Sequence, residues 1–249
     1  MSTPIGRTGL TRITPQLGEA PVVMSSPSVI GFFDDFLGNL IDTKWKFTEG
    51  TDGATADLGF ATGDVGGVLR LTTGDTGTGT AADQCGLASA LQWKASNGGL
   101  TASARVKLSQ ITDAYLFFGF SDSMAFETPV ESAGVLNTLT TTASDAVGFM
   151  FDTRMTSDKF WLVGVKGNVD AVAQDSGVAP VADTFVNLRV NLSNAGVASF
   201  YIDDTGVGSA MVDAVTAATA LTPCLLVSKT ATATSMYAEL DYVAVSSNR

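Results

Sequence analysis

From Gly31 onward the chain consists of short apolar runs separated by Gly, Asn, Asp and Ser. Such runs, bounded by turn residues, are typical of β-strands joined by tight connections. The pattern therefore predicts an all-β domain. Its clearest strands are expected at Gly67–Thr72, Leu100–Leu108, Tyr115–Phe120, Val147–Phe151, Phe160–Val165, Thr184–Leu192, Val197–Ile202, Pro223–Ser228 and Met236–Val245.

The runs are of two kinds. Phe185–Leu192 alternates apolar and polar residues, which predicts an antiparallel strand with one buried face. Leu116–Phe120 and Phe160–Val163 are apolar at every position except a glycine, which suits central strands of two stacked sheets. Turn residues at 166–168 and 193–196 predict hairpins. Together these features predict a two-sheet antiparallel sandwich.

Two segments depart from the strand pattern. Ser209–Ala220 is rich in alanine and predicts a short turn or a bridging helix. Ser123–Asp145 has weak periodicity and is expected to be a long inserted loop, a kind of segment that tends to be functional in compact domains.

Residues 1–30 form a separate region, which contains four of the seven prolines. Proline favours extended backbone, so this region is either a disordered tail or an extended arm that orders on a neighbouring subunit. Its scattered apolar residues favour the arm, and Arg7 and Arg12 make residues 1–18 basic. We therefore expect an arm at 1–30 and one domain at 31–249. The expected contact residues of the arm are Ile5, Arg7, Leu10, Arg12, Ile13 and Leu17.

Charge narrows the choice of partner. The chain has 14 basic and 25 acidic residues and a net charge of −11. Such a surface repels nucleic acid and anionic membranes, so neither is an expected partner. No apolar run is long enough to span a bilayer. The first residues also lack the apolar segment of a secretory signal, so we expect synthesis in a cytosol without export.

The chain contains no histidine. This excludes Ser-His-Asp and Cys-His catalysis in their usual forms, and it excludes His-ligated metal sites. Cys85 and Cys224 are the two cysteines, and the sequence leaves open whether they form a disulfide or two buried thiols. No cofactor and no metal ligand is predicted.

Several motifs carry a family resemblance in order along the chain. Phe33–Phe36 (FDDF) and Asp42–Trp45 (DTKW) resemble the first strands of the concanavalin A-like lectin/glucanase jelly roll, as found in laminarinases and laminin-G-like domains. Phe185–Val190 with Phe200–Asp204 is similar to a laminin-G-like hairpin. Leu240–Val245 (LDYVAV) resembles the last strand of the family. The resemblance spans residues 31–246 and implies a jelly-roll sandwich.

In that fold the first and last strands are neighbours in one sheet. The resemblance therefore implies packing between the two ends of the domain. The residues expected to meet are Phe33, Phe36 and Trp45 on one side, and Leu240, Tyr242 and Val243 on the other.

Catalysis is not expected. Retaining glycosidases need two carboxylates about 5–5.5 Å apart, which laminarinase-like enzymes supply from one strand as E-x-D-x-x-E. The nearest match, Glu239–Ala244, has Ala244 in place of the second glutamate and lies on the last strand. Leu116–Phe120 and Phe160–Val165 contain no acid. A degenerate glycosidase is therefore the third hypothesis, behind two non-enzymatic ones.

Candidate ligand contacts are few. Asp34 with Asp35, and Asp203 with Asp204, carry the carboxylates that calcium prefers, but adjacent strand residues point to opposite faces. A structural calcium ion is left open and is not predicted. The expected aromatic contacts to a glycan, on loops or sheet edges, are Trp93, Tyr115 and Phe126.

An acidic, catalytically empty jelly roll with a basic arm resembles virion proteins of tailed bacteriophages in which laminin-G-like domains decorate or cement the shell. The leading hypothesis is a capsid decoration protein on the outer surface of a phage shell, made in the host cytoplasm. It would form a homotrimer or dimer and bind the major capsid protein through residues 1–30. The alternative is a non-catalytic carbohydrate-binding module of a phage fibre or a bacterial surface protein, with a cell-surface glycan as its ligand.

Overall fold

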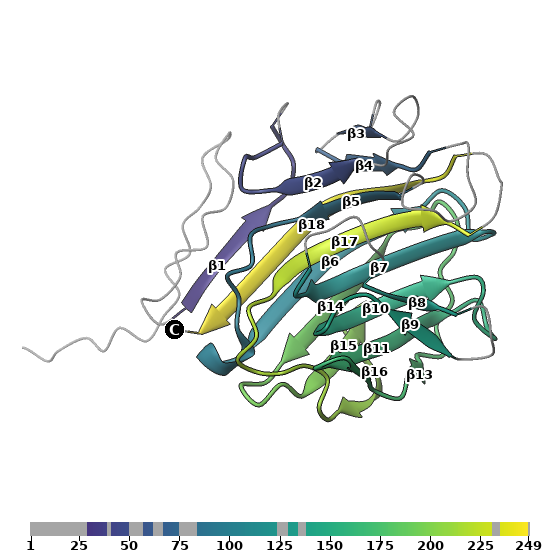
Figure 1. Ribbon diagram of the computed structural model, residues 1–249. Helices are drawn as coiled ribbons and strands as arrows, with labels where there is room; N and C mark the ends of the chain where they lie inside the picture. Colours follow the sequence, from purple (N-terminus) through teal and green to yellow (C-terminus); the bar gives the residue numbers. More distant parts are fainter. Residues whose placement is uncertain are drawn as a thin grey trace, which may run out of the picture.

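The computed structural model is built from two antiparallel β-sheets that stack as a sandwich (Figure 1). This confirms the all-β jelly-roll prediction. The structure describes residues 29–38, 41–49, 57–61, 67–74, 84–123, 129–133, 138–230 and 235–248. The expected arm at residues 1–30 lies outside this part of the chain apart from Val29 and Ile30.

Sheet A holds the strands near both ends of the domain. In spatial order it contains β16 (Thr205–Met211), β15 (Ala198–Ile202), β14 (Val186–Leu192), β6 (Leu100–Leu108), β18 (Tyr237–Asn248), β4 (Leu69–Thr72) and β3 (Asp57–Phe60), and β1 (Val29–Asp34) also pairs with β18. Burial alternates residue by residue along β6, so one face of sheet A is in the core and the other faces outward. In β14, Leu188, Val190 and Leu192 are buried, which confirms the alternation predicted there.

Sheet B is buried more deeply. In spatial order it contains β12 (Val169–Asp170), β11 (Phe160–Lys166), β10 (Ala146–Asp152), β7 (Ala114–Ser121), β17 (Thr222–Lys229), β5 (Gln84–Ala88) and β2 (Lys46–Glu49), and β13 (Gln174–Asp175) also pairs with β11. Every residue of β7, β10 and β17 is buried. Their apolar runs predict this, because a strand covered on both faces shows no alternation.

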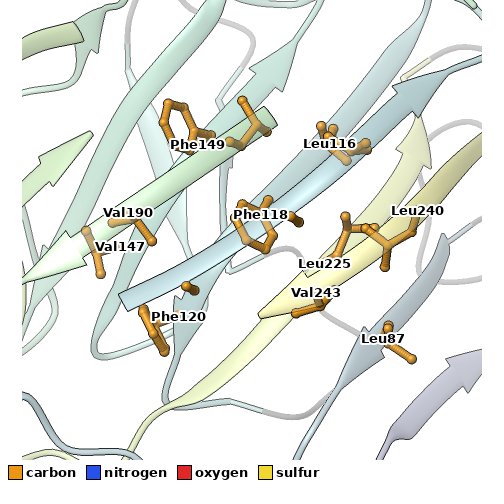
Figure 2. Close-up of a cluster of buried hydrophobic side chains, with 14 of the residues drawn as sticks. Leu87, Leu116, Phe118, Phe120, Val147, Phe149, Val190, Leu225, Leu240 and Val243 are labelled. Carbon is orange, nitrogen blue, oxygen red and sulfur yellow. The ribbon is translucent and has the colours of Figure 1, made fainter. Parts of the chain in front are cut away.

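The main core lies between the sheets (Figure 2). Phe118 of β7 and Leu225 of β17 lie in this core together with Val190 of β14 and Leu240 of β18. The ring of Phe149 on β10 meets Phe200 on β15 edge-on, with ring centroids 5.5 Å apart. Burial of these apolar surfaces is the main stabilising term of the sandwich.

A second apolar cluster covers the opposite face of sheet B. It is lined by Tyr115, Phe117, Met150 and Trp161, and a small hairpin supplies Val130 to it. The hairpin consists of β8 (Val130–Ser132) and β9 (Leu139–Thr141), beside β10 and β11 in Figure 1. This corrects the expectation that residues 123–145 lack strands. Strands of three residues are too short to produce a readable alternation.

The first and last strands are neighbours, as the resemblance implies. Val29–Asp34 pairs antiparallel with Val243–Asn248, and Phe33 stacks on Tyr242 with ring centroids 5.8 Å apart. Trp45 is buried next to β1, where its indole Nε1 donates to Asp34 Oδ2 at 2.6 Å. The two ends of the domain are therefore joined within sheet A.

The bridging helix allowed for at Ser209–Ala220 does not form. Strand β16 continues to Met211, and turns follow to residue 219. Gly208 and Asp213 adopt left-handed backbone conformations, with φ of 64° and 56°, which a right-handed helix excludes. In the described part of the chain the helical element is the 3₁₀ turn Ala95–Asn97, and no helix there is long and apolar enough to cross a membrane.

Candidate functional site: the outer face of sheet A

The outer face of sheet B, turned away from sheet A, has one carboxylate at its centre strands, and that carboxylate is engaged. Asp152 at the end of β10 is fully buried. Its Oδ2 accepts hydrogen bonds from the Ser132 backbone N–H at 2.9 Å and from Arg154 NH2 at 2.8 Å. Arg154 also pairs with Glu131 at 2.9 Å. This group fastens β8 to β10 and leaves Asp152 unable to reach a substrate.

Two of the three expected glycan contacts are buried, which corrects their predicted exposure. Tyr115 is 1% exposed and donates its hydroxyl to the Val130 carbonyl at 2.5 Å. Burial raises the pKa of Tyr115 well above its usual value, and the nearby carboxylate of Asp152 raises it further. Trp93 is 4% exposed and its ring lies 6.0 Å from that of Phe32. Both rings complete apolar clusters, as large aromatic side chains usually do, so neither offers a face to a ligand.

The remaining predicted site residues lie outside the described part of the chain. These are Phe126 and the arm residues Ile5, Arg7, Leu10, Arg12, Ile13 and Leu17.

Aromatic side chains gather instead on the outer face of sheet A. We call this set the outer aromatic face. It consists of the half-buried rings of Phe33 (β1), Phe185 (preceding β14), Tyr201 (β15), Tyr237 (β18) and Tyr242 (β18). They occupy the polar phase of the strand alternation, where the buried neighbours point into the core.

The guanidinium groups of three arginines lie over three of these rings. The Arg70 Cζ lies 4.1 Å from the Tyr237 ring centroid. Arg105 lies 4.4 Å from Phe185, and Arg189 lies 4.4 Å from Tyr201. Cation–π contacts of this kind fix both partners relative to the sheet.

Carboxylates pair with the same three arginines. Arg105 pairs with Asp241 at 2.7 Å, and Arg189 pairs with Asp204 at 3.0 Å. Glu239, only 1% exposed, pairs with Arg70 at 2.5 Å and also with Lys107. Burial alone would raise the pKa of Glu239, yet hydrogen bonds from Lys107 and Arg70 hold that pKa below its usual value. The face therefore presents aromatic rings beside ion-paired side chains.

The pairing of β15 with β16 leaves a hollow at one edge of this face. Its volume is about 190 Å³, and it is lined by Ser199, Tyr201 and residues 206–210 of β16. Arg189, Tyr201 and Gly206 stand in one row across β14, β15 and β16. The hollow therefore lies beside Tyr201, next to the edge strand β16.

The aspartate pairs considered for calcium are engaged within the fold. Asp34 accepts hydrogen bonds from the Phe36 backbone N–H and from Trp45. Asp203 accepts two from Asn187, and Asp204 binds Arg189. Within the described ranges no three His, Cys, Asp or Glu side chains are grouped as metal ligands.

Comparison with known proteins gives the fold class. No protein-family model matches the chain, and no curated protein matches its sequence. Among solved structures, the Bacillus licheniformis β-glucanase aligns with a TM-score of 0.57 at 14% identity, over 86% of this chain and 97% of the glucanase. The Emp47p carbohydrate recognition domain aligns at 0.58 and 9% identity, over 89% and 97% of the two chains. Peanut lectin aligns at 0.55 and 12% identity, over 89% and 99%. At such identities the likeness shows the fold alone, which is the concanavalin A-like lectin/glucanase jelly roll.

Proposed function

We propose that this protein is a non-catalytic, lectin-like carbohydrate-binding domain that binds glycan through the outer aromatic face. The observation that carries the proposal is the set of half-buried rings whose neighbouring guanidinium and carboxylate groups are fixed by ion pairs. A sugar presents apolar C–H faces and hydroxyl groups together, so it suits a surface that offers ring faces beside ordered donors and acceptors. Solved structures of the same fold include carbohydrate-binding proteins.

The proposal that the domain is non-catalytic rests on the carboxylates of sheet B. Glycoside hydrolysis needs two accessible carboxylates on opposite sides of the scissile bond. Asp152 is fully buried and bound by Arg154 and by the Ser132 backbone. Hairpin β8–β9 adds Val130 to the apolar cluster beside it. Within the described residues, the centre strands of the outer face of sheet B thus present no accessible pair of acids, which supports the proposal.

A glycan array combined with hydroxyl-radical footprinting tests the proposal. We expect saturable binding to at least one glycan and protection of Tyr201 or Tyr242 in the complex. Protection confined to the hairpin Val130–Thr141 would contradict the assignment to sheet A. Absence of binding across the array would contradict the proposed function itself.

The second candidate function is a capsid decoration protein that binds a phage major capsid protein through residues 1–30. Two observations favour it: the basic, proline-rich sequence of the arm, and the position of β1, which holds residue 29 against β18 at the border of sheet A. In this account the protein is a homotrimer or dimer on the outer surface of the virion.

Charge reversal in the arm tests the second candidate. Arg7→Glu with Arg12→Glu should abolish cosedimentation with shells made of the major capsid protein, while Lys44→Glu should not. Unchanged cosedimentation of the arm variant would contradict this candidate.

A further inference from the structure

The pairing of β15 with β16 contains a register shift. Ala198 pairs with Met211 and Phe200 pairs with Val207, so one residue of β15 faces three residues of β16. Such bulges re-aim side chains and interrupt the ladder, and they are over-represented at sheet edges and next to functional sites. Here the bulge opens the hollow of about 190 Å³ beside Tyr201.

Strand β16 contains two glycines, Gly206 and Gly208, and the backbone requires glycine at only one of these two positions. Gly208 has φ of 64°, and a Cβ there would lie 2.3 Å from Leu162 Cδ1, so the fold itself requires glycine. Gly206 has no such constraint. A Cβ at Gly206 would meet only two carbons of the Tyr201 ring, at 3.7 and 3.9 Å, which is ordinary contact.

Gly206 therefore leaves space that a side chain could fill. Glycine within a strand gives up packing and β propensity, and it often marks a place where a ligand approaches closely. The unfilled space lies directly against Tyr201, because Tyr201 and Gly206 are cross-strand partners.

The Tyr201 ring is held from the other side. Arg189 stacks on it from β14, with 4.4 Å between Cζ and the ring centroid, and Asp204 holds that guanidinium at 3.0 Å. Because β15 lies between β14 and β16, the ring side away from Arg189 faces Gly206 and the hollow. The ring is thus fixed before any ligand arrives, which reduces the entropy lost on binding.

We propose that the hollow between β15 and β16 is a subsite for a single neutral sugar ring, which stacks on Tyr201 and occupies the space above Gly206. Ser199 and Ser209 line the same hollow, and serine hydroxyls can exchange hydrogen bonds with the hydroxyl groups of a pyranose. Asp203 and Asp204 form the adjoining turn and disfavour an anionic sugar. This inference rests on the proposed carbohydrate binding and assigns it a location and a ligand class.

The test uses a panel of methyl pyranosides (gluco, galacto, manno and N-acetylglucosamine) and methyl glucuronide, with affinities from NMR titration of the full chain. Tyr201→Ala should weaken binding of the preferred neutral sugar at least about tenfold. Gly206→Val should do the same by filling the hollow, while a β-branched residue in a strand keeps the protein folded. Lys44→Ala is the control, because Lys44 pairs with Asp42 at the surface and is not part of the outer aromatic face. Its binding should stay within about twofold of the unmodified chain.

The outcomes separate the two claims. Equal loss of affinity in Tyr201→Ala and Lys44→Ala, unchanged affinity in Gly206→Val, or equal affinity for glucoside and glucuronide would overturn the subsite. Array-positive glycans with no bound methyl pyranoside would also overturn it and leave the proposed function standing. No binding in either assay would overturn both.

Discussion

Cys85 and Cys224 lie on neighbouring strands and point to opposite faces of sheet B. Cys85 pairs with Val227, and Cys224 pairs with Ala88, so the two positions are three residues out of register. Side chains alternate between faces along a strand, which places Cys85 in the main core and Cys224 in the second cluster. A disulfide needs the two Cβ atoms on the same side, so both remain buried thiols.

This arrangement predicts different labelling rates for the two thiols. Cys85 is completely buried between the sheets, and reaching it requires the sandwich to open. Cys224 is 8% exposed and lies in the second cluster, so local opening of that outer layer exposes it. Mass spectrometry after timed alkylation of the native protein should show modification of Cys224 first. Equal rates at the two positions would mean that the second cluster opens only with the whole domain.

Alkaline pH should destabilise the fold through Cys224. Burial raises the pKa of Cys224 from 9.0 to about 12. The folded state therefore keeps a proton that the unfolded chain releases, so stability is fully present below pH 9.0 and declines as pH rises toward about 12. The slope from one such group is at most about 1.4 kcal/mol per pH unit. Urea unfolding between about pH 8 and pH 11 should give a shallower decline for Cys224→Ala than for the unmodified protein. Parallel curves would contradict this role.

Arg154 should be a major determinant of stability on the outer face of sheet B. Arg154→Met leaves the buried Asp152 carboxylate without its charged partner, which should cost about 3 kcal/mol. It should also accelerate alkylation of Cys224 more than that of Cys85, because the ion pairs of Arg154 with Asp152 and Glu131 secure β8 over the second apolar cluster.

Lys166→Met is the matched control for this change. Lys166 pairs with Asp213 at the surface, and an exposed ion pair contributes less than about 1 kcal/mol. Similar losses in both variants, measured by urea unfolding at neutral pH, would show that burial of Asp152 does not matter.

Glu239 should make sheet A sensitive to acid. Lys107 and Arg70 hold its pKa below the usual value despite burial, so its contribution is present above about pH 4.5 and is lost as pH falls through the folded-state pKa. Glu239→Gln removes one partner of a buried ion pair and should cost about 3 kcal/mol near neutral pH. The difference in unfolding free energy between the two proteins should shrink below about pH 4.5. A difference that stays constant down to low pH would contradict this assignment.

The sequence predicts the strands well where local periodicity decides the structure. Leu100–Leu108 forms over the predicted residues, and the pairing of β1 with β18 follows from motifs at the two ends of the domain. It fails where distant residues decide. Trp93 and Tyr115 have the sequence context of edge residues. Trp93 is buried in the main core beside Phe32, and Tyr115 is buried in the second cluster beside Val130.

The outer aromatic face escapes sequence analysis for the same reason. Arg70 and Glu239 are 169 positions apart, and Tyr201 meets Gly206 and Arg189 only through strand register. In the sequence, Tyr201 is one polar-phase residue in a strand and carries no sign of a hollow beside it.

The central claim is that this jelly roll binds carbohydrate without cleaving it. The most direct measurement mixes the protein with the glycans that bind it on an array. Calorimetry follows binding, and chromatography of the same samples detects new reducing ends. We predict saturable binding with no reducing ends above the protein-free blank. Failure to bind any glycan, or release of reducing ends that persists in Tyr201→Ala and is lost in Asp152→Asn, would contradict it.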